Sequence, residues 1–368
     1  MNKCAVYLAI IFLISCRALV TTFDDIQDAV TFTAASKTDE PTSVDNLKVM
    51  TWNIRFGAAR IPWFGDSCGD RVLMTEAEVA TNMDSIVLFI NSELPDILLI
   101  QEIDLSSKRS AYMNQVQYIL DNTYFNYGVY ASNWDVEIIP SDGLGKVDMG
   151  NAILSRWKIT DAERIQLPLR TDQDDLTQYF YLRRNILKAK IELPIIEDFY
   201  VVDIHATAFA TDDTKQKHIS KYKEVLDELN NQGAVFVTGG DLNSIPPGAD
   251  STDFCLEDIC SGESFHTETD VGPHREGSYF NNFTGEPDLV QPFYVYHPAI
   301  DSISTRDQIH FTHSPWNTNY TNNNYWDRKL DYLFTNLTDG FSHGTTHQEA
   351  HQLSDHAPVS ATLNFSNY

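Results

Sequence analysis

The chain has 368 residues, of which 42% are hydrophobic, and its formal net charge at pH 7 is −26. That length allows two or three domains, each with its own core. The strong negative charge opposes nonspecific binding to polyanions, and no run of Lys and Arg offers a track for a nucleic-acid backbone. Composition alone therefore disfavours, without excluding, a protein that binds nucleic acid.

The first 20 residues have the pattern of an export signal. Lys3 supplies a positive start, and residues 5–14 form an apolar stretch that is too short to span a bilayer. Leu13-Ile14-Ser15-Cys16 is similar to a bacterial lipobox, whose cysteine is lipidated; the alternative is ordinary cleavage after a small residue such as Ala18. Residues 21–46 are polar and predict a flexible tether. We expect an exported protein, either extracellular or attached to a membrane through an N-terminal lipid.

The body of the chain alternates helix and strand patterns, which is typical of an α/β fold. Thr75 and Glu78 have the spacing of a capping box, which begins a helix that ends before Pro95. A second helix is expected over residues 107–120, and a third after Asp213. Apolar runs before and after each helical pattern predict the strands that alternate with the helices.

Two of these runs, over residues 180–191 and 199–204, predict paired strands with Pro194 in the turn. Other strand-like runs end in an amide, a carboxylate or an imidazole. A buried strand that ends in a polar group places that group at the edge of a sheet, where open α/β sheets bind ligands. The polar residues that follow or end such segments are Asn53, Glu102, Asp241, Asp331 and His356.

With these segments in this order, the chain resembles the endonuclease/exonuclease/phosphatase superfamily, the fold of DNase I, abasic-site endonucleases, inositol polyphosphate phosphatases and neutral sphingomyelinases. Two further segments, Val201–His205 and Met149–Arg156, are similar to other strands of that family. The resemblance covers about residues 48–364. It implies a four-layer α/β/β/α sandwich, in which two mixed β-sheets pack face to face with helices outside. It also implies a single catalytic domain over residues 47–368.

The resemblance implies a metal-dependent phosphoric ester hydrolase that uses Mg²⁺, with Mn²⁺ able to substitute, and a water molecule as nucleophile. Hard divalent cations prefer oxygen ligands, which fits the amide and carboxylates at the strand ends. The predicted site residues are Asn53, Glu102 and Asp355 for the metal; His205, Asp241, Asn243, Asp331 and His356 for catalysis; and Asn151, Arg55 and Arg183 for the substrate phosphate.

The residue types fit these roles. His205 and His356 can divide the two proton transfers of phosphodiester hydrolysis, and the resemblance makes Asp331 the carboxylate that orients His356. Asp241 and Asn243 are two residues apart, so in an extended segment their side chains point the same way. The alternative for this pair is an Asx turn that closes a strand.

Arginines are the second group of candidates near the sheet edge. A guanidinium can hold a phosphate through two parallel hydrogen bonds, and Arg55, Arg183 and Arg184 are the candidates for this role. In so acidic a protein, the alternative is that these arginines form salt bridges at the surface.

Residues 245–327 form a long aromatic-rich region with little periodicity. We expect ordered loops beside the site; the alternative is that they pack on the edge of the sandwich. Cys255 and Cys260 are close enough in sequence to form a small disulfide loop, or to be two free thiols. His343, His347 and His351 recur every four residues, which on a helix gives either a transition-metal site or a solvated face.

Three functions remain open at this point. The first is an exported phosphodiesterase of the sphingomyelinase type that acts on lipids or their head groups, which the acidic charge and aromatic loops favour. The second is a secreted DNase-like nuclease, which the histidine pair favours. The third is a binding module without activity, which the complete set of site residues disfavours. We expect a monomer that binds a phosphodiester substrate, either a lipid head group or a nucleic acid.

Overall fold

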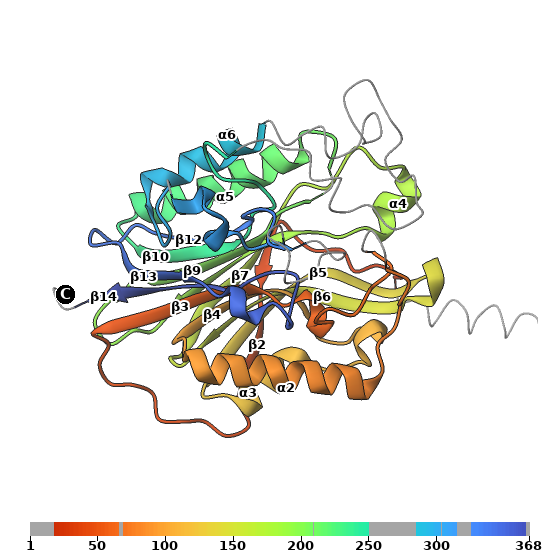
Figure 1. Ribbon diagram of the computed structural model, residues 1–368, viewed down its shortest axis with the longest axis horizontal. Coiled ribbons are helices and arrows are strands. Elements are labelled where there is room, and N and C mark those ends of the chain that lie inside the picture. The colour runs from red at the N-terminus through yellow and green to blue at the C-terminus, as the bar shows by residue number, and fades with distance from the viewer. Residues whose placement is uncertain are drawn as a thin grey trace, which may run out of the picture.

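The computed structural model describes residues 18–65, 69–208, 210–249, 285–302, 304–314 and 325–365. Its two seven-stranded sheets pack face to face, with helices on both outer sides (Figure 1). Helices α5 (Thr214–Asn231) and α6 (Glu286–Val290) lie outside one sheet, and α2 (Glu76–Glu93) and α3 (Gln115–Asn122) lie outside the other. The predicted four-layer α/β/β/α sandwich of two mixed sheets is confirmed.

The sheet beside α2 and α3 is called sheet A, and it carries the first two predicted site residues. Its strand β3 runs parallel to β4, and the remaining pairs are antiparallel. In spatial order its strands are β13 (Phe341–Thr346), β14 (Val359–Asn364), β3 (Asn46–Asn53), β4 (Ile97–Asp104), β6 (Gly145–Ser155), β5 (Tyr127–Ile139) and β2 (Val30–Thr33).

Sheet B, beside α5 and α6, carries Asp241 and Asp331, whereas His356 lies just before β14 of sheet A. The strands β9 and β10 of sheet B are parallel, so their carboxyl ends lie at the same edge of the sheet. In spatial order its strands are β1 (Ile26–Asp28), β7 (Ile159–Gln166), β8 (Asn185–Ile191), β9 (Phe199–His205), β10 (Val235–Asp241), β12 (Asp331–Thr335) and β11 (His297–Pro298).

The inward faces of the two sheets form one apolar core. Val49 and Leu99 from sheet A pack in the same cluster as Leu187, Val201 and Leu333 from sheet B, and all five are almost fully buried. Burial of this kind stabilises a fold by about 1.5–3 kcal/mol for each large aliphatic side chain. The core holds the two sheets in fixed relative positions, so that side chains from both sheets can meet at one edge.

Helix α2 forms as its sequence predicts. The Thr75 hydroxyl accepts a hydrogen bond from the Glu78 N–H, and the Glu78 carboxylate accepts one from the Thr75 N–H. The helix ends at Glu93, and its cap Leu94 has a left-handed conformation just before Pro95. Helix α5 likewise follows Asp213, as predicted.

The second predicted helix is too long. Helix α3 begins only at Gln115, with Asn114 as its cap, and residues Lys108–Ser110 form a 3-10 turn instead. Ala111 and Tyr112 both have positive φ angles of 54° and 59°. Two consecutive left-handed residues cannot continue a right-handed helix, so the helix is restricted to residues after them.

The prediction of a strand from residue 180 is also wrong in its first part. Residues Asp175–Phe180 form the short helix α4, because the Asp174 side chain accepts hydrogen bonds from the N–H groups of Leu176 and Thr177. The strand β8 begins at Asn185 and pairs with β9 in antiparallel register, as predicted for the later part.

Residues 21–46 are not the flexible tether that their polarity predicts. Strand β1 pairs with β7 at the edge of sheet B, and β2 pairs with β5 at the edge of sheet A. The segment therefore forms one edge strand of each sheet. An edge strand is held by hydrogen bonds between backbone groups, and these do not require apolar side chains. None of the helices in the described ranges has the length and apolar character needed to cross a membrane.

The aromatic region 245–327 is only partly described. Phe293 and Tyr296 pack with α5 and β12 in the outer core of sheet B, and Tyr325 and Trp326 pack against Ala357. Phe293 and Tyr296 therefore pack on the sandwich, as in the alternative, whereas Tyr325 and Trp326 contact the neighbour of His356, as expected of ordered loops beside the site. Cys255 and Cys260, and the remaining aromatics at 250–284 and 315–324, lie outside the described residues.

Candidate active site

Polar groups from both sheets meet at one edge of the sandwich. Asn53 ends β3, and its Nδ2 lies 3.3 Å from Glu102 Oε1 in β4 and 3.2 Å from Asp241 Oδ2 at the end of β10. The Asn53 side chain is almost fully buried. One amide therefore links a carboxylate of sheet A to a carboxylate of sheet B, and it fixes their separation.

His356 and Asp331 form a buried pair beside this link. The His356 Nδ1 lies 2.8 Å from Asp331 Oδ2, and Asp331 is the first residue of β12, directly opposite Asp241 in the sheet register. With Nδ1 donating to Asp331, the His356 Nε2 faces Asp241 Oδ2 at 3.8 Å. This arrangement fixes the tautomer and the orientation of the His356 ring, as a carboxylate does in a catalytic triad.

His205 approaches Asp241 from the other side. It ends β9, in register with Asp241 on the parallel strand β10. Its Nε2 lies 3.4 Å from Asp241 Oδ2 and 3.9 Å from Glu102 Oε1. Its Nδ1 is buried and has no hydrogen-bond partner within the described part of the chain. Two imidazoles thus point their Nε2 atoms at one carboxylate.

The environments of the two histidines shift their pKa values in opposite directions. Burial lowers the pKa of His205, and the positive charges of Arg184 and His356 lower it further, so the ring is neutral near pH 7. Burial alone would also lower the pKa of His356, but the charges of Asp331 and Asp241 outweigh it and hold that pKa well above its usual value. One ring is therefore held neutral and the other is held protonated.

Asp241 lies between the two rings. Burial raises its pKa to about 7, against the opposing effect of the charge on His356. A carboxyl group with a pKa near neutrality can exchange a proton at working pH, which is what a general acid or base requires. The three side chains therefore differ in pKa: His205 is neutral, His356 is protonated, and Asp241 lies between them. Such a difference assigns a base role to the first and an acid role to the second.

Glu102 and Asp355 supply the carboxylates predicted for a metal. Glu102 has a positive φ of 55° at a bulge in β4 and is partly exposed, so the bulge turns its side chain toward the edge. Burial and the negative charge of Asp355 raise the pKa of Glu102. Burial would raise the pKa of Asp355 too, but the charges of Arg55 and His356 lower it overall.

A divalent cation fits this donor set. The charge of Asp355 disfavours ionisation of Glu102, so the two carboxylates repel each other, and a cation between them would remove that repulsion. Asn53 lies beside Glu102 and its Oδ1 accepts a hydrogen bond from the Arg55 N–H at 3.0 Å. A carbonyl oxygen has a second lone pair, so Asn53 still has one acceptor position to offer.

Asn243 does not extend from the strand as predicted. It has a φ of 47°, and its N–H donates to Asp241 Oδ1 at 2.9 Å, which is the Asx turn considered as the alternative. Its Nδ2 donates to the Ala206 carbonyl at 3.1 Å. The side chains of Asp241 and Asn243 therefore do not point the same way; Asn243 fixes the turn that follows Asp241 and ties it to the end of β9.

The arginines predicted for phosphate have other partners. Arg55 lies at the site, where its Nε is 3.3 Å from Asp355 Oδ2 and its Nη1 donates to the Ala59 and Ile61 carbonyls. Arg183 lies away from the cluster, with its Nη1 on the Tyr179 and Tyr181 carbonyls beside α4. The structure thus brings Arg55 to the site as the counter-charge of Asp355, and it does not bring Arg183 there.

Arg184 supports the site from behind, whereas Asn151 has other partners. The Arg184 Nη1 donates to the His205 carbonyl at 3.1 Å, and the side chain is largely buried. Asn151 is fully buried in β6, where its Oδ1 accepts from Asn133 and its Nδ2 approaches the Asn185 carbonyl. No contact joins Asn151 to the catalytic cluster within the described residues.

Three polar residues at the site were not predicted from the sequence. Gln101 is fully buried, and its Nε2 donates to Asp203 Oδ1 at 2.6 Å and to Thr51 Oγ1 at 3.1 Å, so it joins the two sheets beneath the cluster. The signal for this link was present, because Gln101 and Asp203 interrupt apolar strands. His313, whose ring centroid lies 5.4 Å from that of His356, gives no such signal, because it lies in the irregular loop region.

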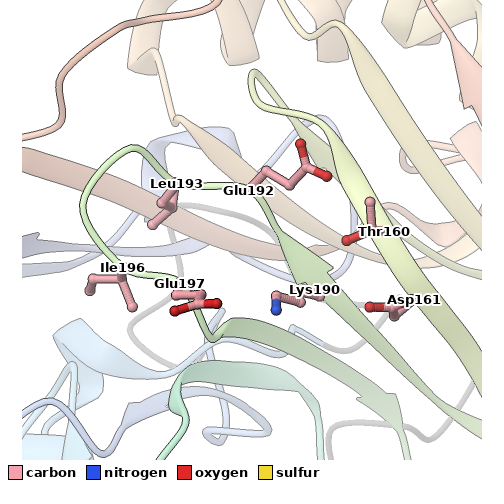
Figure 2. Close-up of a pocket in the computed structure, with 7 residues that line it drawn as sticks. All are labelled: Thr160, Asp161, Lys190, Glu192, Leu193, Ile196 and Glu197. Atoms are coloured by element: carbon pink, nitrogen blue, oxygen red, sulfur yellow. The ribbon is translucent and has the colours of Figure 1, made fainter.

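A separate hollow of about 490 Å³ lies far from this cluster (Figure 2). Its lining includes Lys190 and Glu192 at the far end of β8, and Thr160 near the start of β7. The catalytic cluster lies at the ends of β9 and β10, which is the opposite edge of the sheet. The hollow is therefore not part of the candidate active site.

The fold is the phosphoesterase fold of the DNase I-like superfamily. The chain belongs to the Endonuclease/Exonuclease/phosphatase family, whose model matches residues 50–356. No curated protein sequence matches the chain.

Solved structures show the same fold at low identity. An endonuclease/exonuclease/phosphatase from Beutenbergia cavernae is 18% identical, with a TM-score of 0.55, over 87% of this chain and 72% of that one. A family protein from Leptotrichia buccalis is 15% identical, with a TM-score of 0.51, over 87% of this chain and 100% of that one. A humanized D. rerio TDP2 is 14% identical, with a TM-score of 0.49, over 87% of this chain and 100% of that one.

Proposed function

We propose that this protein is an exported, divalent-metal-dependent phosphodiesterase whose preferred substrates are lipid-type head groups that carry a single phosphodiester. The observation that carries the catalytic part is the pair His205 and His356, which point at Asp241 from opposite sides and have pKa values shifted in opposite directions. The complete cluster also disfavours a binding module without activity. Export, by the signal or lipobox at residues 1–20, rests on the sequence alone.

In this proposal the protein's own residues divide the proton transfers. Asp241 and the neutral His205 orient the attacking water and accept its proton, since their atoms lie within 3.4 Å of each other. His356, kept protonated by Asp331, donates a proton to the leaving oxygen. Asn53 donates hydrogen bonds to both Glu102 and Asp241 and so holds these two carboxylates, one from each sheet, at a fixed separation. A divalent cation held by Glu102, Asp355 and Asn53 would polarise a phosphoryl oxygen and lower the pKa of water.

Removal of divalent cations should abolish hydrolysis. Dialysis against EDTA should reduce the rate to background, and Mg²⁺ or Mn²⁺ should restore it, because Glu102 and Asp355 are acceptors suited to hard cations. The measurement is the rate on a chromogenic phosphodiester before and after metal is added back. The same rates after dialysis without EDTA are the control, and full activity in excess EDTA would show that the metal proposal is wrong.

The substrate preference follows from charge. With a net charge of −26, the protein gains little from counterion release on a long polyanion, and the arginines at the site, Arg55 and Arg184, are already bound to Asp355 and to the His205 carbonyl. A zwitterionic head group carries one phosphate and is repelled far less. An aromatic ring can bind a quaternary ammonium, but Trp326 is buried with only 5% of its surface exposed, so it does not contribute.

A choline-type phosphodiester should therefore be cleaved with a higher kcat/KM than duplex DNA at physiological salt. The measurement is a panel of sphingomyelin, plasmid DNA and an inositol phosphate with the same Mg²⁺-loaded protein. The Glu102→Gln variant serves as the control for contaminating activities. Rapid plasmid degradation without release of phosphocholine would reverse the preference and favour the secreted nuclease.

A further inference from the structure

A second group of metal-ligating side chains lies away from the catalytic cluster. It is formed by Glu93, the last residue of α2, and by His347 and Glu349, which lie between β13 and β14. One ligand atom from each of the three residues lies within 4.8 Å of the other two. We propose that this group binds a divalent transition metal of the Zn²⁺ class, in a site that is independent of the phosphodiesterase reaction.

His347 is held as a metal-binding imidazole usually is. Its side chain is only 5% exposed, and its ring packs edge-on against Phe89, with the centroids 5.6 Å apart. Its Nε2 lies 2.8 Å from the buried Ser360 hydroxyl, which can accept a hydrogen bond from that nitrogen. In that tautomer Nδ1 carries the lone pair, so a metal would replace its contact with Glu349, and the hydrogen bond on the far nitrogen fixes the ring orientation.

The carboxylates converge on the same nitrogen. Glu349 Oε1 lies 2.9 Å from His347 Nδ1, and Glu93 Oε2 lies 3.8 Å from it. One imidazole nitrogen with two carboxylate oxygens is a donor set that Zn²⁺ and its neighbours in the first transition row accept, with water in the remaining position. The Glu349 side chain is 63% exposed, so an ion can enter from solvent.

Two features near Glu93 act on the charge of the site. Glu93 ends α2, and the C-terminal end of a helix favours a cation. Lys48 competes, because its Nζ lies 3.0 Å from Glu93 Oε2. The same Nζ also donates to the Glu93 carbonyl at 2.6 Å, so Lys48 keeps a partner when a metal takes the carboxylate. The proposal thus predicts that Lys48 weakens metal binding without preventing it.

The site lies between the end of α2 and the segment that leads to His356, so a bound metal would connect the two. The His347 N–H donates to the Pro358 carbonyl at 2.8 Å, two residues from His356. A metal that joins His347 and Glu349 to Glu93 would fasten this segment to α2. The sequence spacing of His343, His347 and His351 placed all three on one helical face, but His343 lies in β13 and only His347 joins the cluster.

The test uses tag-free protein in which the catalytic ligands have been removed by Glu102→Gln and Asp355→Asn. Metal-free protein is titrated with Zn²⁺ by calorimetry and with Co²⁺ by visible absorption, which reports nitrogen and oxygen ligation directly. We expect a saturable site that raises the Tm and depends on His347 and Glu349, whereas any binding at the second group able to hold a metal, Asp241, Asp331 and His356, should not change with those two residues. His347→Gln and the exposed Glu349→Gln should each weaken binding at least about tenfold, and Lys48→Met should tighten it about two- to fivefold.

The matched control is His343→Asn, which changes an exposed histidine four residues away and should leave binding unchanged. Because Glu349 is exposed, its variant folds even if His347→Gln does not. The proposal is overturned if the Glu102→Gln, Asp355→Asn protein shows no saturable binding, or if Glu349→Gln binds Zn²⁺ as tightly as its parent. Since the readouts are binding and Tm, these outcomes do not depend on whether the protein is a phosphodiesterase.

Discussion

Replacing His356 by alanine should lower kcat by about 10²–10⁴-fold, the usual contribution of a positioned acid or base. The change removes the ring that Asp331 orients at 2.8 Å and that faces Asp241 at 3.8 Å. KM should change much less than kcat, because the lost proton transfer belongs to the transition state. The measurement is steady-state kinetics on the preferred phosphodiester in saturating Mg²⁺.

Three further variants make this test specific. Asp331→Asn keeps the shape of the pair but removes the charge that keeps His356 protonated, so kcat should fall while the Tm stays close to that of the wild type. His205→Ala should also lower kcat. His297→Ala is the control and should be silent, because His297 is an exposed histidine in β11, opposite Thr335 at the other end of β12 from Asp331. A His356→Ala protein that keeps the wild-type kcat would show that the assigned role is wrong.

The strand-end residues could be predicted from sequence for a physical reason. A polar residue that ends an apolar strand lies at the edge of the sheet. The parallel pairs β3/β4 and β9/β10 bring several such ends to one edge. Asn53, His205 and Asp241 lie in the predicted cluster for this reason, and Asp331 joins them as the first residue of β12, which runs antiparallel to β10. The histidine–carboxylate pair His356–Asp331 was implied by family resemblance, and spacing alone did not predict it.

Other features depend on backbone conformation, which residue type does not specify. Arg55 and Asn243 have positive φ angles of 47° each, and both turn their side chains toward backbone carbonyls. The two strands Ile26–Asp28 and Val30–Thr33 were missed because edge strands are held by backbone hydrogen bonds, which leave no apolar pattern. Sequence periodicity reports burial, so it predicted α2 and α5 well and the edge strands poorly.

Loss of the Arg109 guanidinium should destabilise the fold more than any surface substitution. Arg109 donates to both oxygens of Asp104, at 3.0 Å and 2.9 Å, and both side chains are almost fully buried. Its guanidinium also lies 3.6 Å from the centroid of the Phe56 ring. In Arg109→Met the Asp104 carboxylate would keep the Ser110 hydroxyl but lose its counter-charge. We expect the free energy of unfolding to fall by about 3–5 kcal/mol, as for other buried pairs that lose one partner. Urea denaturation followed by fluorescence measures it.

The double variant Asp104→Leu, Arg109→Met separates the charge from the packing. With both partners apolar, no unpaired charge remains, and most of the lost stability should return, because a buried ion pair contributes little beyond an apolar pair of similar volume. Lys158→Met, in the exposed pair with Glu192, is the matched surface control and should leave the denaturation midpoint unchanged. If Arg109→Met is no less stable than Lys158→Met, the Asp104–Arg109 pair does not hold the end of β4. The position of Glu102 would then have to depend on the bulge and on Asn53 alone.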